Sequence, residues 1–220
     1  MFNFFSKQPN LDADGRKRLL DEVITPMIAS LGLEKKGDYV WHTSGNAAIR
    51  HGLEYTLLKG DSGTLTWGVC LDFVPLASGS SLKLYKTEKA FKFHLFEWTD
   101  EYMTSFSGGN MSGGVIHHTD SKRTKEALIK LLGRYIPKAK LWLDTCNNID
   151  QITKTAEQQA NTGGGYNLHH PNPKYILPFL YAKQHLETQA ITQFNALDLV
   201  YFNNKQELKD KAFKHLVGLL

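Results

Sequence analysis

The opening of this chain constrains its fold more than any other segment, because it passes from a helical pattern through a turn into a strand. Apolar side chains recur every three or four residues from Leu20 to Leu31, as on the buried face of an amphipathic helix. Asp12 or Asp14 can cap the start of this helix. Pro26 predicts a kink or a break inside it, and Gly32 is a suitable C-terminal stop.

Strand patterns follow that turn. Tyr39-Val40-Trp41 is a short aromatic strand signal, and apolar side chains then alternate with polar ones over residues 53–57 and 65–73. The Gly-Asp-Ser-Gly sequence at residues 60–63 indicates a hairpin turn between the two longer segments. These patterns predict an antiparallel meander with one face on a core and the other partly exposed to water.

Two further strand candidates extend the meander, one starting at Leu82 and one at Phe91. Phe91 and Phe93 share one face of the second candidate, and Lys92 and His94 share the other. A stretch of this kind, basic and aromatic, can stack bases while its lysines contact phosphates, so RNA or DNA binding is one alternative function. The alternation itself favours a buried apolar face and a solvated basic face.

The second half of the chain is helical in pattern. Asp120 or Ser121 can cap a helix whose apolar stripe runs from Thr124 to Tyr135. Pro137 predicts an interruption of that helix. Further helical patterns cover residues 141–152, 175–186, 190–197 and 208–217.

We therefore predict an α+β protein in which a leading helix packs on a four- to five-stranded antiparallel sheet, followed by a helical C-terminal region. The expected division is an α+β domain over residues 1–137 and a helical region over residues 138–220 packed on it, with a linker near residues 161–173. The alternative is one compact unit.

Composition and charge restrict the class of protein. The 41% hydrophobic and 22% charged residues are ordinary for a soluble globular chain, and a net charge of +4 is small for an arm that coats nucleic acid. Cys70 and Cys146 are too few for a disulfide framework, so we expect free thiols in a reducing compartment. Because no signal-peptide core or membrane-spanning stretch occurs, we expect a cytoplasmic protein without a membrane partner.

The order of these patterns resembles a bacterial domain family of unknown function. In that family a leading helix runs into a Gly-Phe-x-Lys-x-Gly turn, then an aromatic residue, a sheet and a helical tail. Here the turn is Gly32-Leu33-Glu34-Lys35-Lys36-Gly37, with Leu33 where the family usually has Phe. The resemblance implies the α+β fold but no known activity, cofactor or catalytic residue. Relatives near toxin or defence genes imply an interaction or immunity role.

The glycine-rich segment from Gly108 to Asp120 is a candidate binding loop. Gly108 and Gly113 have the spacing of a phosphate-binding loop, but the next two residues are Gly and Val where that loop needs Lys and then Ser or Thr. Binding there through backbone groups and Met111 stays open. A hydrolase or nuclease-like enzyme with a site near this loop is the main alternative to a binding function.

Two histidine pairs, His117-His118 and His169-His170, are weak candidates for metal ligands. Zinc needs three or four ligands that converge, and adjacent histidines on extended backbone point apart. The sequence contains no His-Glu-x-x-His motif. We therefore predict no metal site and no cofactor.

The predicted helix after Asp120 also has a basic side. Arg123, Lys130 and Arg134 lie opposite its apolar stripe. A solvated face is the usual explanation of such a pattern, and a docking surface for an acidic protein is the alternative. Because the sequence contains no complete catalytic motif, we predict a non-catalytic interaction module, with another protein as its partner and with toxin immunity or defence as its implied setting.

Overall fold

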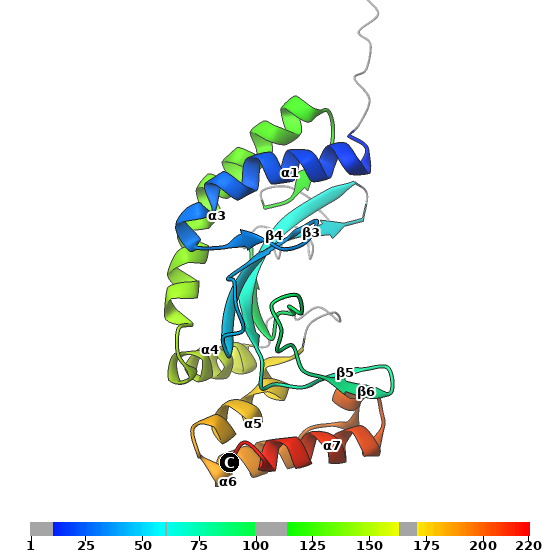
Figure 1. Cartoon of the computed structure of the whole chain (residues 1–220), viewed down its shortest axis with the longest axis vertical. Coiled ribbons are helices and arrows are strands. Elements are labelled where there is room, and N and C mark those ends of the chain that lie inside the picture. Colours follow the sequence, from blue (N-terminus) through cyan, green and yellow to red (C-terminus); the bar gives the residue numbers. More distant parts are fainter. Residues whose placement is uncertain (1–10, 60, 100–113, 163–170) are drawn as a thin grey trace, which may run out of the picture. The chain divides into compact units, whose positions relative to one another are not determined.

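The computed structural model describes residues 11–59, 61–99, 114–162 and 171–220. It confirms the predicted α+β class, with an N-terminal helix, an antiparallel sheet and C-terminal helices (Figure 1). The chain divides into two compact units that interleave along the sequence. The first unit comprises residues up to 42, 53–67 and 98–140, and the second comprises residues 43–52, 68–97 and 141–220.

The leading helix α1, Ala13–Met27, begins where the sequence predicts. Of the two candidate caps, Asp12 is the one used, because its Oδ1 accepts a hydrogen bond from the backbone N–H of Gly15 at 2.6 Å. The buried stripe of α1 belongs to the first unit and consists of Leu19, Leu20, Val23 and Ile24.

The end of α1 also follows the prediction of a break. Pro26 cannot donate a backbone hydrogen bond, and the helix ends one residue after it. A 3₁₀ turn, η1 (Ala29–Leu31), then leads to Gly32, whose φ of 65° reverses the chain. Glycine occupies that left-handed conformation without the steric penalty of a Cβ.

Replacing the cap, Asp12→Ala, is expected to lower the free energy of unfolding by about 1 kcal/mol, because the N–H of Gly15 loses its acceptor. The matched control is Asp14→Ala, which removes a carboxylate from the same helical turn without removing this bond. Urea denaturation of both variants measures the difference. Equal destabilisation by the two substitutions would show that charge near the helix start, rather than the cap, carries the effect.

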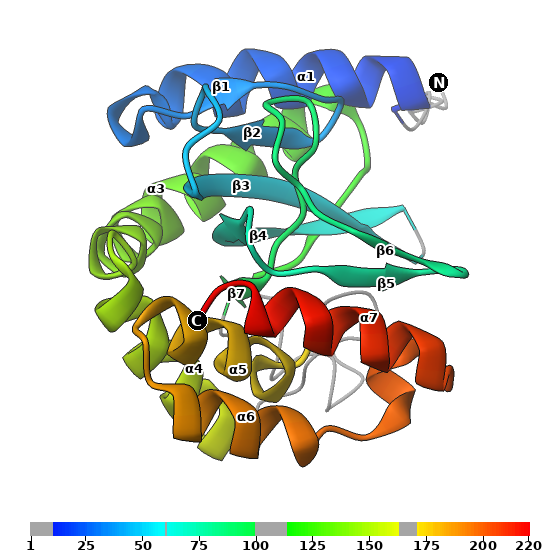
Figure 2. The same cartoon turned by 60° about the horizontal axis from the view of Figure 1, so that its bottom comes forward.

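The main sheet contains six strands within the described residues, in the order β1-β2-β3-β4-β7, with β8 paired to β4 (Figure 2). The bounds of the strands are Glu34–Lys35 for β1, Val40–His42 for β2, Ile49–Leu58 for β3, Ser62–Leu71 for β4, Leu95–Trp98 for β7 and Ile116–His117 for β8. A separate antiparallel hairpin in the second unit pairs β5 (Leu76–Ser78) with β6 (Ser81–Lys83).

Strand β4 is buried along its whole length, so the prediction of a partly wet face is wrong for this strand. In the first unit, Thr64 is buried on one face, and Trp67 on the other lies near Tyr135 with ring centroids 6.1 Å apart. In the second unit, a Cβ on Gly68 would come within 2.4 Å of the carbonyl oxygen of Leu95. Both faces are covered because later segments of the chain fold back over the side that the alternation pattern assigned to water.

Residues 91–94 are not a strand, and β7 begins only at Leu95. His94, which the alternation places on a solvated face, is fully buried. Its Nδ1 accepts a hydrogen bond from the N–H of Leu71 at 3.0 Å, so Nε2 carries the proton and donates it to the carbonyl of Val74 at 3.0 Å. The predicted strand over residues 91–94 and the predicted solvated position of His94 are therefore wrong.

Helix α3, Ser121–Thr145, runs through Pro137, where the sequence predicts an interruption. Asp120 caps it by accepting a hydrogen bond from the N–H of Arg123 at 3.0 Å. Pro137 has no backbone N–H to donate to the carbonyl of Gly133, four residues earlier. Both residues are exposed. Water can solvate a carbonyl on that side, which lets the helix continue past the proline.

The second unit is completed by helices around a shared core. They are α4 (Ile149–Thr162), α5 (Pro173–Lys183), α6 (Glu187–Asn195), the 3₁₀ turn η2 (Leu199–Phe202) and α7 (Gln206–Val217). α5 is buried along most of its length and packs against α4, α6 and α7. The predicted helices from residue 175 onward are confirmed, whereas the helical pattern over residues 141–152 is divided between the end of α3 and the start of α4. Asn172, within the predicted linker, caps α5.

Candidate functional site

Helix α3 places the three predicted basic residues on one exposed side. At 3.6 residues per turn, Arg123, Lys130 and Arg134 point within roughly 40° of one another around the helix axis. Lys138 continues the row, and all four side chains are exposed. We call these four residues the basic face of α3; they span ~22 Å of the first unit. The opposite side holds the predicted apolar stripe, which is buried: Thr124, Leu128, Leu131, Leu132 and Tyr135.

The basic face is supported by local contacts rather than by burial. Arg123 forms an ion pair with Asp120 at 3.5 Å while 79% of its side chain stays exposed. The guanidinium carbon of Arg134 lies 5.7 Å from the ring centroid of Tyr135, and the ammonium nitrogen of Lys138 lies 4.9 Å from it. These cation–π contacts hold two of the four positive charges near one aromatic ring.

The histidine pair that the structure describes, His117-His118, does not belong to a metal centre within the described residues. His117 is exposed on β8, whereas His118 is 2% exposed, so the two side chains lie in different environments. Across residues 11–59, 61–99, 114–162 and 171–220, no three His, Cys, Asp or Glu side chains cluster in a way that could hold a metal ion. The other candidates, His169, His170 and Met111, lie outside those ranges, as does the loop from Gly108 as far as residue 113.

His118 is held by a buried tyrosine. Its Nε2 lies 2.7 Å from the hydroxyl of Tyr55. Burial lowers the pKa of His118 to about 4, with the nearby charge of Arg16 acting in the same direction, and burial raises the pKa of Tyr55 well above its usual range. Efficient proton transfer needs a pKa near the working pH, so this pair supports the position of β8 rather than acid–base chemistry at neutral pH.

Both thiols are free, as the sequence predicts, and both are buried. Burial raises the pKa of Cys70, and it raises the pKa of Cys146 to about 11. The thiolate is the reactive form of cysteine, and neither environment favours it. We therefore assign a nucleophilic role to neither side chain.

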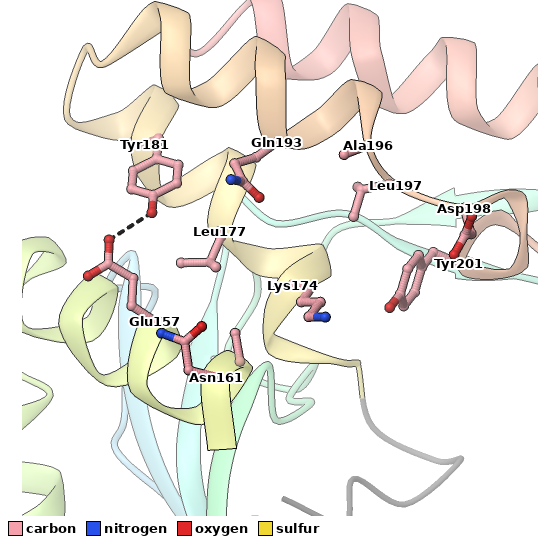
Figure 3. Close-up of a pocket in the computed structure, with 11 residues that line it drawn as sticks. Glu157, Asn161, Lys174, Leu177, Tyr181, Gln193, Ala196, Leu197, Asp198 and Tyr201 are labelled. Carbon is pink, nitrogen blue, oxygen red and sulfur yellow. Dashed lines mark hydrogen bonds between the residues drawn. The ribbon is translucent and has the colours of Figure 1, made fainter. Parts of the chain in front are cut away.

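A groove of about 590 Å³ lies among the helices of the second unit (Figure 3). α4 contributes Glu157 and Asn161, and α5 contributes Lys174, Leu177 and Tyr181. The Tyr181 hydroxyl donates a hydrogen bond to Oε1 of Glu157 at 2.7 Å. Because burial and this carboxylate raise the pKa of Tyr181 to about 12, the phenol keeps the proton that it donates.

The chain from α6 to η2 forms the other side of the groove. Gln193 belongs to α6, Leu197 and Asp198 to the connection, and Tyr201 to η2. Figure 3 shows Asp198 beside Tyr201 at one end, with Lys174 between them and the Glu157–Tyr181 pair. The groove thus has charged ends and a mostly polar lining, beneath which Leu177 and Leu197 are 6% exposed each.

Comparisons of the chain with protein-family models, with curated proteins and with solved structures find no match. The resemblance to a bacterial domain family stays a prediction. In the described part of the chain, every helix is too short or too polar to cross a membrane.

The groove is the feature that sequence reasoning missed. Its charged and aromatic residues come from three helical segments, and no two of them form a recognised motif. A tyrosine four residues after Leu177 and an aspartate before η2 are unremarkable in a helical pattern. Only the packing of α5 against α4 and α6 brings them to one place.

Proposed function

We propose that this chain is a non-catalytic interaction module whose basic face on α3 binds an acidic surface of another protein. One observation carries the proposal: four cationic side chains project from one exposed side of a helix whose opposite side is fixed in the core. A preformed row of charges on a rigid helix steers an acidic partner and sets its register. Toxin immunity or defence, which the family resemblance implies, is one setting for such a module.

A protein fits this face better than a nucleic acid. The aromatic ring nearest the row, Tyr135, is buried and is therefore closed to stacking with bases. The described part of the Gly108–Asp120 loop holds His118 in a buried contact with the Tyr55 hydroxyl, so its geometry gives no support to an enzyme site there.

Charge reversal tests this proposal. The double variant Arg123→Glu, Arg134→Glu is expected to lose at least about nine-tenths of the partner captured in a pull-down from nuclease-treated lysate, because like charges then face the acidic surface. The matched control is Lys154→Glu, Lys214→Glu, which replaces exposed lysines of the second unit. Each double changes the net charge from +4 to 0, since each reversal removes two charges.

Comparing the two double variants distinguishes an effect of the basic face from an effect of net charge. Equal loss of capture with both doubles would assign the interaction to net charge alone, and unchanged capture with the α3 double would remove the basic face from the account. A species that is captured only when the nuclease is left out, and whose affinity falls steeply with salt, would favour the nucleic-acid alternative instead.

A further inference from the structure

We propose that the groove in the second unit binds a short zwitterionic ligand, an amino acid or a dipeptide, with its ammonium group at Asp198 and Tyr201 and its carboxylate at Lys174. This inference is independent of the interaction through α3, because the groove belongs to the other unit and shares no residue with the basic face.

Opposite charges line the groove without neutralising each other. Among the described residues, neither Lys174 nor Asp198 takes part in an ion pair, and both side chains are exposed at its rim. Glu157 differs from Asp198 because one of its oxygens already accepts the Tyr181 hydroxyl. A ligand that carries both charges can pair with Lys174 and Asp198 at once through charge-assisted hydrogen bonds.

The aromatic end suits the ammonium group. The ring of Tyr201 is held by its neighbour Tyr175, with ring centroids 5.9 Å apart, and Asp198 lies close enough for its charge to act on the Tyr201 hydroxyl. A cation between a carboxylate and the face of an aromatic ring is attracted by both. The ammonium end is therefore assigned to this pair of residues.

The volume of the groove and the residues that line it determine which class of ligand fits. A volume of about 590 Å³ falls in the range of small-molecule sites. The small side chains of Ala160 and Ala196 line the groove beside a ligand side chain, and the amides of Asn161 and Gln193 can bond a peptide group. A polyamine would match Asp198 but would meet the like charge of Lys174, so a zwitterion fits the lining better.

Calorimetric titration of the full chain tests the assignment with leucine and alanyl-leucine as probes. N-acetyl-alanyl-leucine lacks the ammonium charge and alanyl-leucinamide lacks the carboxylate, and each is expected to bind about three- to tenfold more weakly than alanyl-leucine. Lys174→Met should abolish the preference over the amide, and Asp198→Asn the preference over the acetylated peptide. The matched control is Lys154→Met, an exposed lysine of α4 outside the groove.

Two results would overturn the inference. One is the absence of saturable binding of both leucine and alanyl-leucine at concentrations up to ~10 mM, which is above the dissociation constant of even a weak ligand. The other is binding whose charge preferences are the same in Lys174→Met, Asp198→Asn and the wild type. Circular dichroism of each variant confirms that it is folded, so that lost binding reports on the groove. Neither result bears on the basic face of α3.

Discussion

Replacing Arg50 with methionine is expected to lower the free energy of unfolding by about 3 kcal/mol, because each buried acceptor left without a donor costs about 1–3 kcal/mol. Arg50 lies in β3, within the second unit, and is fully buried. Its guanidinium donates to the backbone carbonyls of Tyr85 at 2.5 Å, Thr87 at 2.8 Å and Ala90 at 2.8 Å. The segment over residues 85–90 is thus tied to the sheet through one side chain.

The balance between desolvation and hydrogen bonding decides the sign of this effect. The described partners of Arg50 are carbonyl oxygens and the Cys70 sulfur, rather than carboxylates, so the buried charge is costly. Methionine removes that cost, but it also removes the guanidinium donors of three loop carbonyls, of which, within the described residues, only that of Thr87 keeps a backbone donor, the N–H of Ala90 at 2.9 Å. We expect the second effect to dominate, because the loop has no regular pairing of its own in residues 84–94.

Denaturant unfolding of Arg50→Met and Arg50→Lys measures how much the hydrogen bonds of the Arg50 guanidinium stabilise the fold. Lysine keeps the charge but not the planar fork that reaches several acceptors, so it should not restore stability. The control is Arg18→Met on the exposed side of α1, which should change the free energy of unfolding by less than about 0.5 kcal/mol. If Arg50→Met were as stable as Arg18→Met, the guanidinium would not be holding this segment.

Acid is expected to destabilise the fold strongly through its buried histidines. Burial lowers the pKa of His94 to about 3 and that of His118 to about 4, against an ordinary value of 6.5. Between those values the unfolded chain binds more protons than the folded chain, so the free energy of unfolding falls as the pH falls from 6.5. Each histidine removes up to about 1.4 kcal/mol per pH unit within its window and nothing above it.

The substitution His94→Gln isolates the contribution of His94 to the pH dependence of the free energy of unfolding. Glutamine keeps an acceptor and a donor but does not titrate, so the dependence of the unfolding free energy on pH should become shallower by about 1.4 kcal/mol per unit near pH 5. Adding His118→Gln should remove a similar amount, because its window overlaps at that pH. Carboxylates contribute equally to all variants, which makes the difference between slopes the quantity to measure. Slopes that do not change with either substitution would contradict neutral, buried histidines.

Local signals predicted the elements of this fold well where several physical rules agreed. The periodic stripe of α1 and its cap at Asp12 were confirmed, because propensity, capping and burial agree there, but α1 ends at Met27 and Gly32 ends the 3₁₀ turn η1 instead. Pro26 and Pro137 show the limit of such rules. Both prolines are exposed, yet the first lies one residue before the end of α1 and the second lies inside α3, so neither the residue type nor its exposure predicts where a helix ends.

Tertiary packing explains the predictions that failed. Alternation at Phe93 and His94 predicted one dry and one wet face, but both residues are buried because the chain folds over both sides of β4. A histidine with two backbone partners is satisfied in such a place, and nothing in the local pattern reveals those partners. The groove was missed for the same reason, since its residues converge only after the helices pack.

The basic face of α3 was predictable because it belongs to one helix, and its role as a binding surface is the central claim. The most direct test is the affinity of the purified partner, once captured, for the wild type, the Arg123→Glu, Arg134→Glu double and the Lys154→Glu, Lys214→Glu double, measured in one buffer by titration calorimetry. We expect the α3 double to bind at least about tenfold more weakly than the wild type, and the control double to bind as the wild type does. Equal affinities for the wild type and the α3 double would contradict the account.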